Sequence, residues 1–158
     1  MHELPEATER VVRAAEGLGL TIQPIVFPEG TKTSAEAAAA VGADLAQIAK
    51  SLVFIVDTDP VLVLMSGDHR VDTERLAATL DADDARRATL EECRDATGYA
   101  AGGTPAFGHP RSMVVVADRS LMRNEDVWSA AGTPTTVYPI KLSDLVRAAG
   151  ARWVDVAE

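Results

Sequence analysis

The chain is poor in cysteine and has no long apolar run. The single cysteine, Cys93, cannot form an internal disulfide, which is typical of a protein kept in a reducing cytosol. The longest apolar stretches, such as 52–56 and 113–117, are far shorter than the ~20 residues of a membrane-spanning helix. The first residues are acidic and lack the basic start and apolar core of a signal peptide. We therefore expect a cytoplasmic protein without a membrane partner.

The sequence also lacks the usual signals of a metal or cofactor site. Its three histidines (His2, His69 and His109) do not have the spacing of metal ligands. It contains neither a Gly-x-Gly-x-x-Gly pattern nor a Walker sequence. Cys93 lies among acidic residues that do not activate a thiol, and the scattered serines and histidines indicate no catalytic triad. We expect no metal and no organic cofactor.

Basic residues are outnumbered, with 15 Lys and Arg against 24 Asp and Glu and a net charge of −9. This balance argues against a large nucleic-acid surface, because neutralising phosphates requires clustered cations. A local patch is still compatible with it, and the arginines available for one are Arg70, Arg75, Arg86, Arg87 and Arg111.

The 158 residues, 47% of them apolar, suit one domain with its own core. Helices are predicted from hydrophobic spacing, capping residues and glycine stops at 4–18, 33–42, 72–80, 90–96 and 142–149. Strands are predicted at 21–27, 47–56, 61–65, 85–89, 112–117, 127–131, 135–140 and 152–156, with a turn at 58–60. Helices and strands mix without strict alternation. The expected fold is therefore α/β of the α+β type, a single domain with a mixed, mainly antiparallel sheet.

Lys50 stands at the head of the apolar strand 47–56, and it is one of only three lysines. An ammonium there costs free energy unless it is paired or lines a polar cleft. One interpretation is a strand-end lysine whose amine reaches solvent. A second is a cation that stabilises a developing oxyanion. A third, a Schiff-base lysine, has no other support in the sequence.

The loop 98–110 holds four glycines and two prolines and is longer than most connections. It is either a plain surface connection or a functional element. Gly102 and Gly103 free the backbone to approach a ligand closely, and Pro105 stiffens the next turn. Backbone N–H groups here would suit an ester carbonyl that becomes an oxyanion. The segment 66–70 is equally compatible with a tight turn and with a wall of the same site.

These segments, in the order 37–42, 48–54, 66–72 and 98–108, resemble the YbaK-like family of aminoacyl-tRNA editing domains. That family is related to the insertion domain of bacterial prolyl-tRNA synthetase. The resemblance extends over about 16–149 and implies a curved, barrel-like sheet flanked by helices. It implies that 1–158 is one deacylase domain, a trans-editing hydrolase that removes a small wrong amino acid such as alanine or cysteine from tRNA for proline.

On this resemblance the expected catalytic residues are Lys50 and Gly103. A side chain at Gly103 is expected to obstruct the ester and to leave stability unchanged. The expected substrate-binding residues are Gly102, Thr104, Pro105, Ala106, Phe107, Gly108, Ser66, Gly67 and Asp68. Water or the substrate's own side chain would be the nucleophile.

The implied partners are the acceptor end of tRNA and prolyl-tRNA synthetase. The cysteine-removing branch of the family tends to carry an acidic residue on the strand before the last helix, and the segment 136–140 has none. The competing hypothesis is a non-catalytic module that binds aminoacyl or nucleotide ligands in the same cleft.

Overall fold

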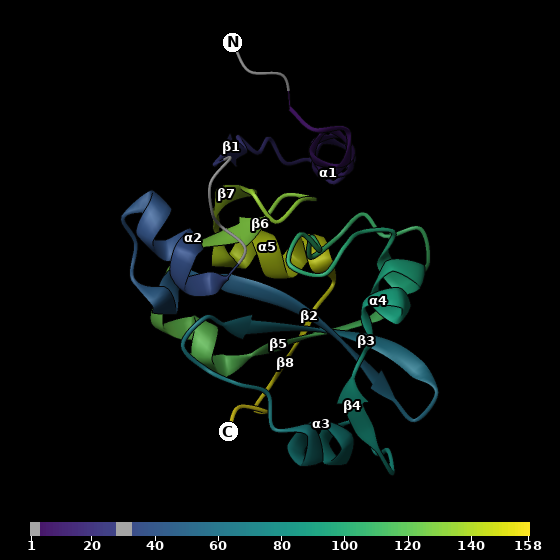
Figure 1. The fold of residues 1–158 in the computed structure, drawn as a ribbon. Helices are drawn as coiled ribbons and strands as arrows, with labels where there is room; N and C mark the ends of the chain where they lie inside the picture. Colours follow the sequence, from purple (N-terminus) through teal and green to yellow (C-terminus); the bar gives the residue numbers. More distant parts are fainter. Residues whose placement is uncertain (1–3, 28–32) are drawn as a thin grey trace.

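The computed structural model describes residues 4–27 and 33–158 and contains two β-sheets with helices around them (Figure 1). The larger sheet has five strands in the order β4-β2-β3-β5-β8. Their bounds are β2 (Ala49–Val56), β3 (Asp59–Ser66), β4 (Ala85–Arg87), β5 (Val114–Asp118) and β8 (Arg152–Val154). β2 pairs antiparallel with β3 and β4, whereas β5 pairs parallel with β3 and β8. The predicted mixed sheet is confirmed.

The β2–β3 hairpin forms the centre of this sheet, and residues 61–66 of β3 are all buried. Val56 pairs with Asp59, so the turn consists of Asp57 and Thr58. Asp57 has a φ of 55°, a conformation that aspartate tolerates better than most residues. The predicted turn at 58–60 is therefore shifted toward the N-terminus, and Pro60 already belongs to β3.

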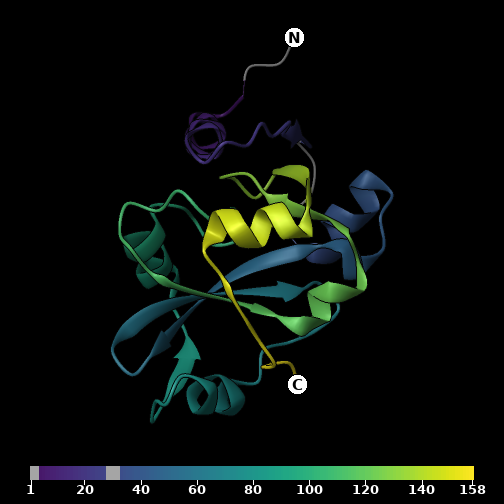
Figure 2. The same cartoon turned by 180° about the vertical axis from the view of Figure 1, so that it is seen from behind.

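The smaller sheet has three antiparallel strands in the order β1-β7-β6. They are β1 (Ile25–Val26), β6 (Asp126–Ala130) and β7 (Thr136–Lys141). The predicted hairpin around Gly132 is confirmed, whereas the strand predicted at 21–27 is reduced to two residues. Figures 1 and 2 both show this sheet above the larger one, with α1 (Glu6–Gly17) at the outer end.

Helix ends lie where the capping signals predict them. Thr33 accepts a hydrogen bond from the N–H of Glu36 at the start of α2 (Ser34–Val41). Thr89, which the sequence placed at the end of a strand, does the same for Glu92 at the start of α4 (Leu90–Thr97), and the strand itself ends at Arg87. Left-handed glycines end three helices, α2, α4 and α5 (Leu142–Ala149). Two short 3₁₀ helices, η1 (Leu45–Gln47) and η2 (Arg119–Arg123), complete the framework.

The core lies on both faces of the larger sheet. On one face, Leu62 and Leu64 of β3 pack with Leu145 of α5, which crosses this sheet in Figure 2. On the other face, residues that alternate with them, such as Met65, pack with Leu76 of α3 (Thr73–Thr79). Both faces of the hairpin are therefore covered, which explains its continuous apolar sequence.

The two sheets meet at one corner, where Ile48 forms a parallel bridge with Trp128 of β6. The α+β class and the mainly antiparallel pairing are confirmed. Within residues 4–27 and 33–158 the strands do not close into a barrel, so the barrel-like curvature implied by the resemblance is not confirmed.

Candidate functional site

The first half of β2 is an open strand edge. β4 pairs only with residues 54–56 of β2 and β6 approaches the strand only at its start, so within the described chain no strand pairs with residues 50–53 on that side. A cavity of about 390 Å³ lies along this edge. Its walls come from α2, β2, β4, the loop 98–110 (the glycine loop), β6 and β7. The polar and aromatic groups among them are Thr33, Ser34, Lys50, Ser51, Arg87, Thr104, Trp128 and Ser129.

Lys50 is half-buried in this wall, and its ammonium makes no hydrogen bond or ion pair within the described residues. Burial lowers the pKa of its ammonium, and the positive charges of Arg87 and Arg70 lower it further. Asp68 acts in the opposite direction but is the weakest of these influences. An unpaired cation that is partly removed from water is well suited to bind an anion or a developing oxyanion.

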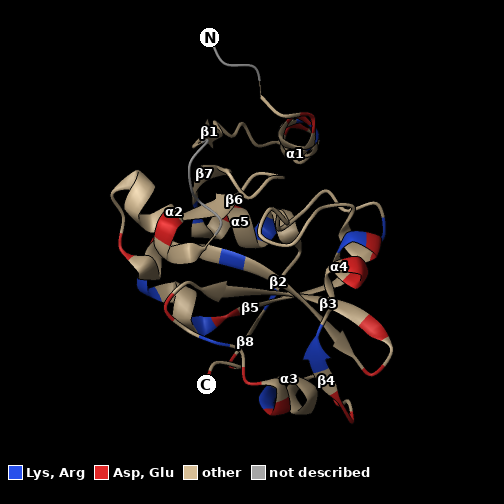
Figure 3. Ribbon diagram, in the orientation of Figure 1, with Lys and Arg blue, Asp and Glu red and all other residues tan. Residues whose placement is uncertain are grey.

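Arg87 gives the cavity a second positive group. It comes from β4, which is drawn mostly blue in Figure 3 because two of its three residues are arginines. The guanidinium carbon of Arg87 lies 5.7 Å from the centre of the Phe54 ring, which directs the side chain over β2. The neighbouring Arg86 is instead bound by both carboxylate oxygens of Glu92 at 2.8 Å. The cavity therefore has a positive wall although the protein as a whole is acidic.

The backbone of Ser51 faces the cavity. The carbonyl of Ala49 accepts a long hydrogen bond of 3.4 Å from the Ser129 hydroxyl, and that of Val53 accepts one of 3.0 Å from Ala88 N–H. Both carbonyls therefore point away from β3. Alternation along an antiparallel strand sends the N–H and carbonyl of Ser51 the same way. Within the described residues neither group has a partner on that side, so the edge offers a free N–H donor beside Lys50.

Two buried hydroxyls near the cavity make no hydrogen bond of good geometry within the described part of the chain. They are the hydroxyls of Ser51, a cavity-lining residue, and of Tyr138, which is fully buried opposite Ser129 in the β6–β7 pair. Burial raises the pKa of Tyr138, and its weaker interaction with the Ser129 hydroxyl acts in the opposite direction, so this phenol stays protonated. Buried polar groups of this kind usually bind ordered water or a ligand.

The glycine loop contributes Gly102 and Thr104 to the cavity wall. Gly102 has a φ of 88°, which a residue with a side chain rarely adopts. Gly103 is tied into a turn, since its N–H donates to Ala100 at 3.0 Å and its carbonyl accepts from Gly132 at 2.9 Å. A Cβ atom at Gly103 would lie 2.6 Å from the Cα of Thr133. Gly103 thus joins the loop to the β6–β7 turn.

The rest of the loop runs into the core. Ala106 and Phe107 are buried, and the Phe107 ring meets Tyr138 edge-on at 6.4 Å between ring centres. Together with Gly108, both residues line a different cavity of about 420 Å³ beside α1 and α5. Pro105 is also buried, and its carbonyl lies 2.8 Å from Nε2 of His109. The structure thus does not place these four predicted substrate-binding residues in the wall around Lys50.

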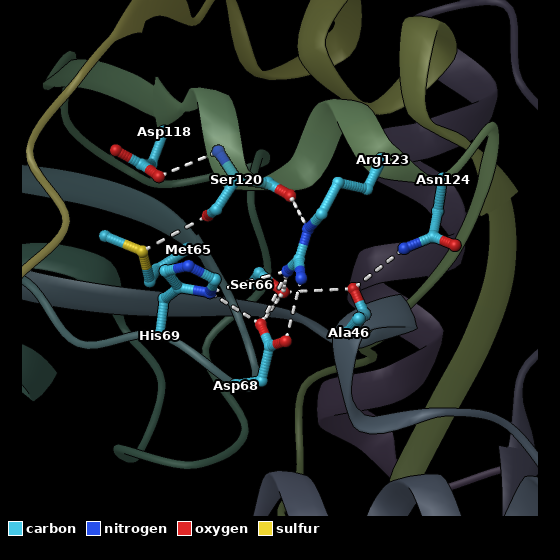
Figure 4. Close-up of polar contacts among 9 residues, drawn as sticks. All are labelled: Ala46, Met65, Ser66, Asp68, His69, Asp118, Ser120, Arg123 and Asn124. Atoms are coloured by element: carbon cyan, nitrogen blue, oxygen red, sulfur yellow. Dashed lines mark hydrogen bonds and ion pairs between the residues drawn. The ribbon is translucent and has the colours of Figure 1, made fainter.

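Ser66, Gly67 and Asp68 also lie outside that wall. Figure 4 shows Ser66 and Asp68 in a polar network with Arg123 of η2, 55 residues further along the chain. The Ser66 hydroxyl donates to the carbonyl of Ala46 at 3.0 Å, and Gly67 N–H donates to the carbonyl of Ile48 at 2.8 Å. The turn 66–68 therefore holds in place residues 46–48, which lead into Lys50.

Several residues in and around the cavity were not predicted from the sequence. Arg87 was only one of five arginines available for a patch, and nothing in the sequence distinguishes it from Arg86. Ser51 had a signal, its position beside Lys50 on the strand. Trp128 and Arg123 had none, because their places depend on contacts between distant segments.

No helix of the described residues is long and apolar enough to cross a bilayer. In the same ranges, no cluster of three or more His, Cys, Asp or Glu residues is arranged to hold a metal ion.

A profile of the family described as "Aminoacyl-tRNA editing domain" matches residues 28–148. The uncharacterized protein YwhH of Bacillus subtilis (strain 168) is 30% identical over 134 residues, 84% of this chain and 85% of YwhH. The proline–tRNA ligase of Lactobacillus acidophilus is 33% identical over 101 residues, 64% of this chain but only 18% of the ligase. A crystal structure described as that of "a putative trans-editing enzyme for prolyl tRNA synthetase" superposes with a TM-score of 0.93 at 36% identity, covering 99% of both chains.

Proposed function

The chain belongs to the aminoacyl-tRNA editing domain family, and on this premise we propose that it is a hydrolase that deacylates mischarged tRNA in trans. One observation carries the proposal: Lys50, the free edge of Ser51 and the loop residues Gly102 and Thr104 line the same cavity. At about 390 Å³ it suits an aminoacyl group and part of the terminal nucleotide, and the body of the tRNA stays outside.

The reaction is the hydrolysis of the ester between the amino acid and the terminal ribose. Water adds to the carbonyl carbon, and the carbonyl oxygen becomes an oxyanion. The Lys50 ammonium and the Ser51 N–H stabilise this oxyanion, and they are held in place before the reaction begins. The C–O bond to the ribose then breaks, the ribose oxygen takes up one proton of the water, the other proton passes to solvent, and the free amino acid leaves as a carboxylate.

We assign the substrate to tRNA for proline that carries a small wrong amino acid. The similarity of this chain to proline–tRNA ligases and to the superposing crystal structure supports this assignment. Residues 136–140 of β7 form the strand before the last helix, where the cysteine-removing branch of the family tends to carry an acidic residue. None is present here, which favours alanine over cysteine as the amino acid that is removed. The tRNA substrate would be the product of a prolyl-tRNA synthetase that has made an error, which makes that enzyme the functional partner.

Single-turnover hydrolysis of alanyl-, cysteinyl- and seryl-tRNA specific for proline tests the proposal. We expect the wild type to cleave at least the alanyl ester, and Lys50→Ala to lose ~10²-fold or more of that rate, the usual cost of removing one oxyanion-stabilising group. Lys141→Ala is the matched control, because Lys141 is an exposed lysine outside the wall of this cavity. Binding without turnover by the wild type would instead identify a non-catalytic module.

A further inference from the structure

Asp68 is the acidic group that acts on Lys50. Lys50 pairs with Met65 in the β2–β3 register, and Asp68 follows Met65 by three residues, just after the end of β3. Its negative charge is the one influence that raises the pKa of Lys50, against burial, Arg87 from β4 and Arg70 from the same turn. A carboxylate that paired with Lys50 would compete with any anion formed on the substrate.

Asp68 cannot lose its charge near neutral pH. Its pKa is held far below the ordinary range, above all by Arg123, with further help from the Ser66 hydroxyl and His69. Arg123 Nη2 lies 2.6 Å from Oδ1 and Nη1 lies 2.9 Å from Oδ2, a bidentate pair. Protonation therefore does not neutralise the Asp68 carboxylate near Lys50. Only the pairing of this carboxylate with Arg123 offsets its charge.

Arg123 is itself fixed in the direction of Asp68. Its Nε donates to the carbonyl of Ser120 at 2.8 Å, and its Nη2 also donates to the Ser66 hydroxyl at 2.8 Å (Figure 4). The side chains are partly open to water, at 44% for Arg123 and 31% for Asp68. The contribution of such an exposed pair to folding is small, so stability alone does not explain the pairing of Arg123 with Asp68.

We propose that Arg123 is a positioning residue that holds the Asp68 carboxylate away from Lys50 and so keeps the Lys50 ammonium free for the substrate. This inference rests on the role of Lys50 in the proposed function. It adds a residue that acts on the site from η2, outside the cavity wall.

A direct test needs no substrate. With only three lysines in the chain, the Lys50 amine can be followed by NMR in protein labelled selectively at lysine. We compare the wild type, Arg123→Gln and the double variant Arg123→Gln/Asp68→Asn across the alkaline pH range in which lysine side chains titrate. We expect the pKa of Lys50 to rise in Arg123→Gln, because Asp68 is then uncompensated, and to fall back in the double variant.

Two controls separate this effect from a general loss of structure. Lys141 reports in the same spectra and is expected to titrate unchanged in every variant. Arg147→Gln removes an exposed arginine that is paired with Asp144 at 3.0 Å on α5, and it is expected to leave Lys50 unchanged. An unaltered pKa of Lys50 in Arg123→Gln would refute the proposal.

Deacylation gives the second readout. We expect Arg123→Gln to lose roughly tenfold in rate, which corresponds to about 1.4 kcal/mol, and the double variant to recover most of it. Failure of the double variant to recover would mean that Arg123 acts only through structure and would overturn the inference. A wild type that cleaves no ester would refute the proposed function alone, since the NMR titration still decides whether Arg123 shields Lys50.

Discussion

The contact between Gly103 and the β6–β7 turn makes a quantitative prediction about stability. A Cβ atom at position 103 would lie 2.6 to 2.8 Å from the Cα, C and N atoms of Thr133. Real Cβ contacts are almost never this short, and the neighbour is backbone, so no side-chain rotation relieves the overlap. From the sequence alone, substitution at Gly103 was expected to affect only catalysis; this contact adds a cost in folding.

The magnitude follows from two losses. Overpacking at a well-packed position costs about 1–3 kcal/mol. The hydrogen bond from Gly132 N–H to the Gly103 carbonyl, 2.9 Å long, must also lengthen, and a typical bond contributes about 0.5–1.5 kcal/mol. We therefore expect Gly103→Ala to lower the free energy of unfolding by about 2–4 kcal/mol. For a chain of this size that corresponds to a fall in Tm of roughly 5–15 °C.

Thermal and urea unfolding of four variants measures this: Gly103→Ala, Gly17→Ala, Thr133→Ala and the double variant Gly103→Ala/Thr133→Ala. Gly17→Ala is the control, because its added Cβ meets nothing within 4 Å and its position at the end of α1 favours alanine. Thr133→Ala gives a second check. The overlap involves the Thr133 backbone, so Gly103→Ala should cost the same free energy whether or not the Thr133 side chain is present. A Tm within about 1 °C of the wild type for Gly103→Ala, against the fall expected from overpacking, would refute the packing argument.

Three further predictions concern the cavity. Lys50→Met should fold normally and be at least as stable as the wild type in urea unfolding, because a partly desolvated, unpaired charge is removed; a clear loss of stability would contradict this. Lys50→Arg should restore little deacylation in single-turnover assays, because the planar guanidinium is larger and differently directed. Wild-type deacylation, corrected for spontaneous ester hydrolysis, should decline as pH rises through the pKa of Lys50. That pKa lies below the ordinary lysine value because of burial, so the decline should start earlier than a free lysine would give, and an unchanged rate up to pH ~11 would exclude the ammonium.

The local structure around the site was predictable because its signals are local. Thr33 and Thr89 cap helices through bonds to residues three positions away, and Gly42, Gly98 and Gly150 end helices through their own φ angles. Such interactions involve neighbours within one helical turn, so a sequence pattern contains both partners. The strand that carries Lys50 was predictable for the same reason, from its continuous β-branched run.

The composition of the cavity was not predictable, because its walls come from segments far apart in the chain. β5 pairs in parallel with β3 and β8, so no short hairpin turn in the sequence indicates these pairings. Residues 102–108 of the glycine loop were expected to contact substrate, yet Ala106 and Phe107 are part of the core. A Gly/Pro-rich sequence indicates an irregular backbone, but only packing against α1 and α5 decides which of its residues are covered.

The sequence by itself determined that Lys50 heads a buried strand, that a glycine loop exists, and that both resemble an editing domain. Only the tertiary structure decided that Lys50 shares a cavity with Gly102 and Thr104, and that Arg123 rather than Lys50 pairs with Asp68. The reason is physical. Helix caps and strand patterns depend on neighbours along the chain, whereas the partner of a charge depends on distances that exist only after the sheets have packed.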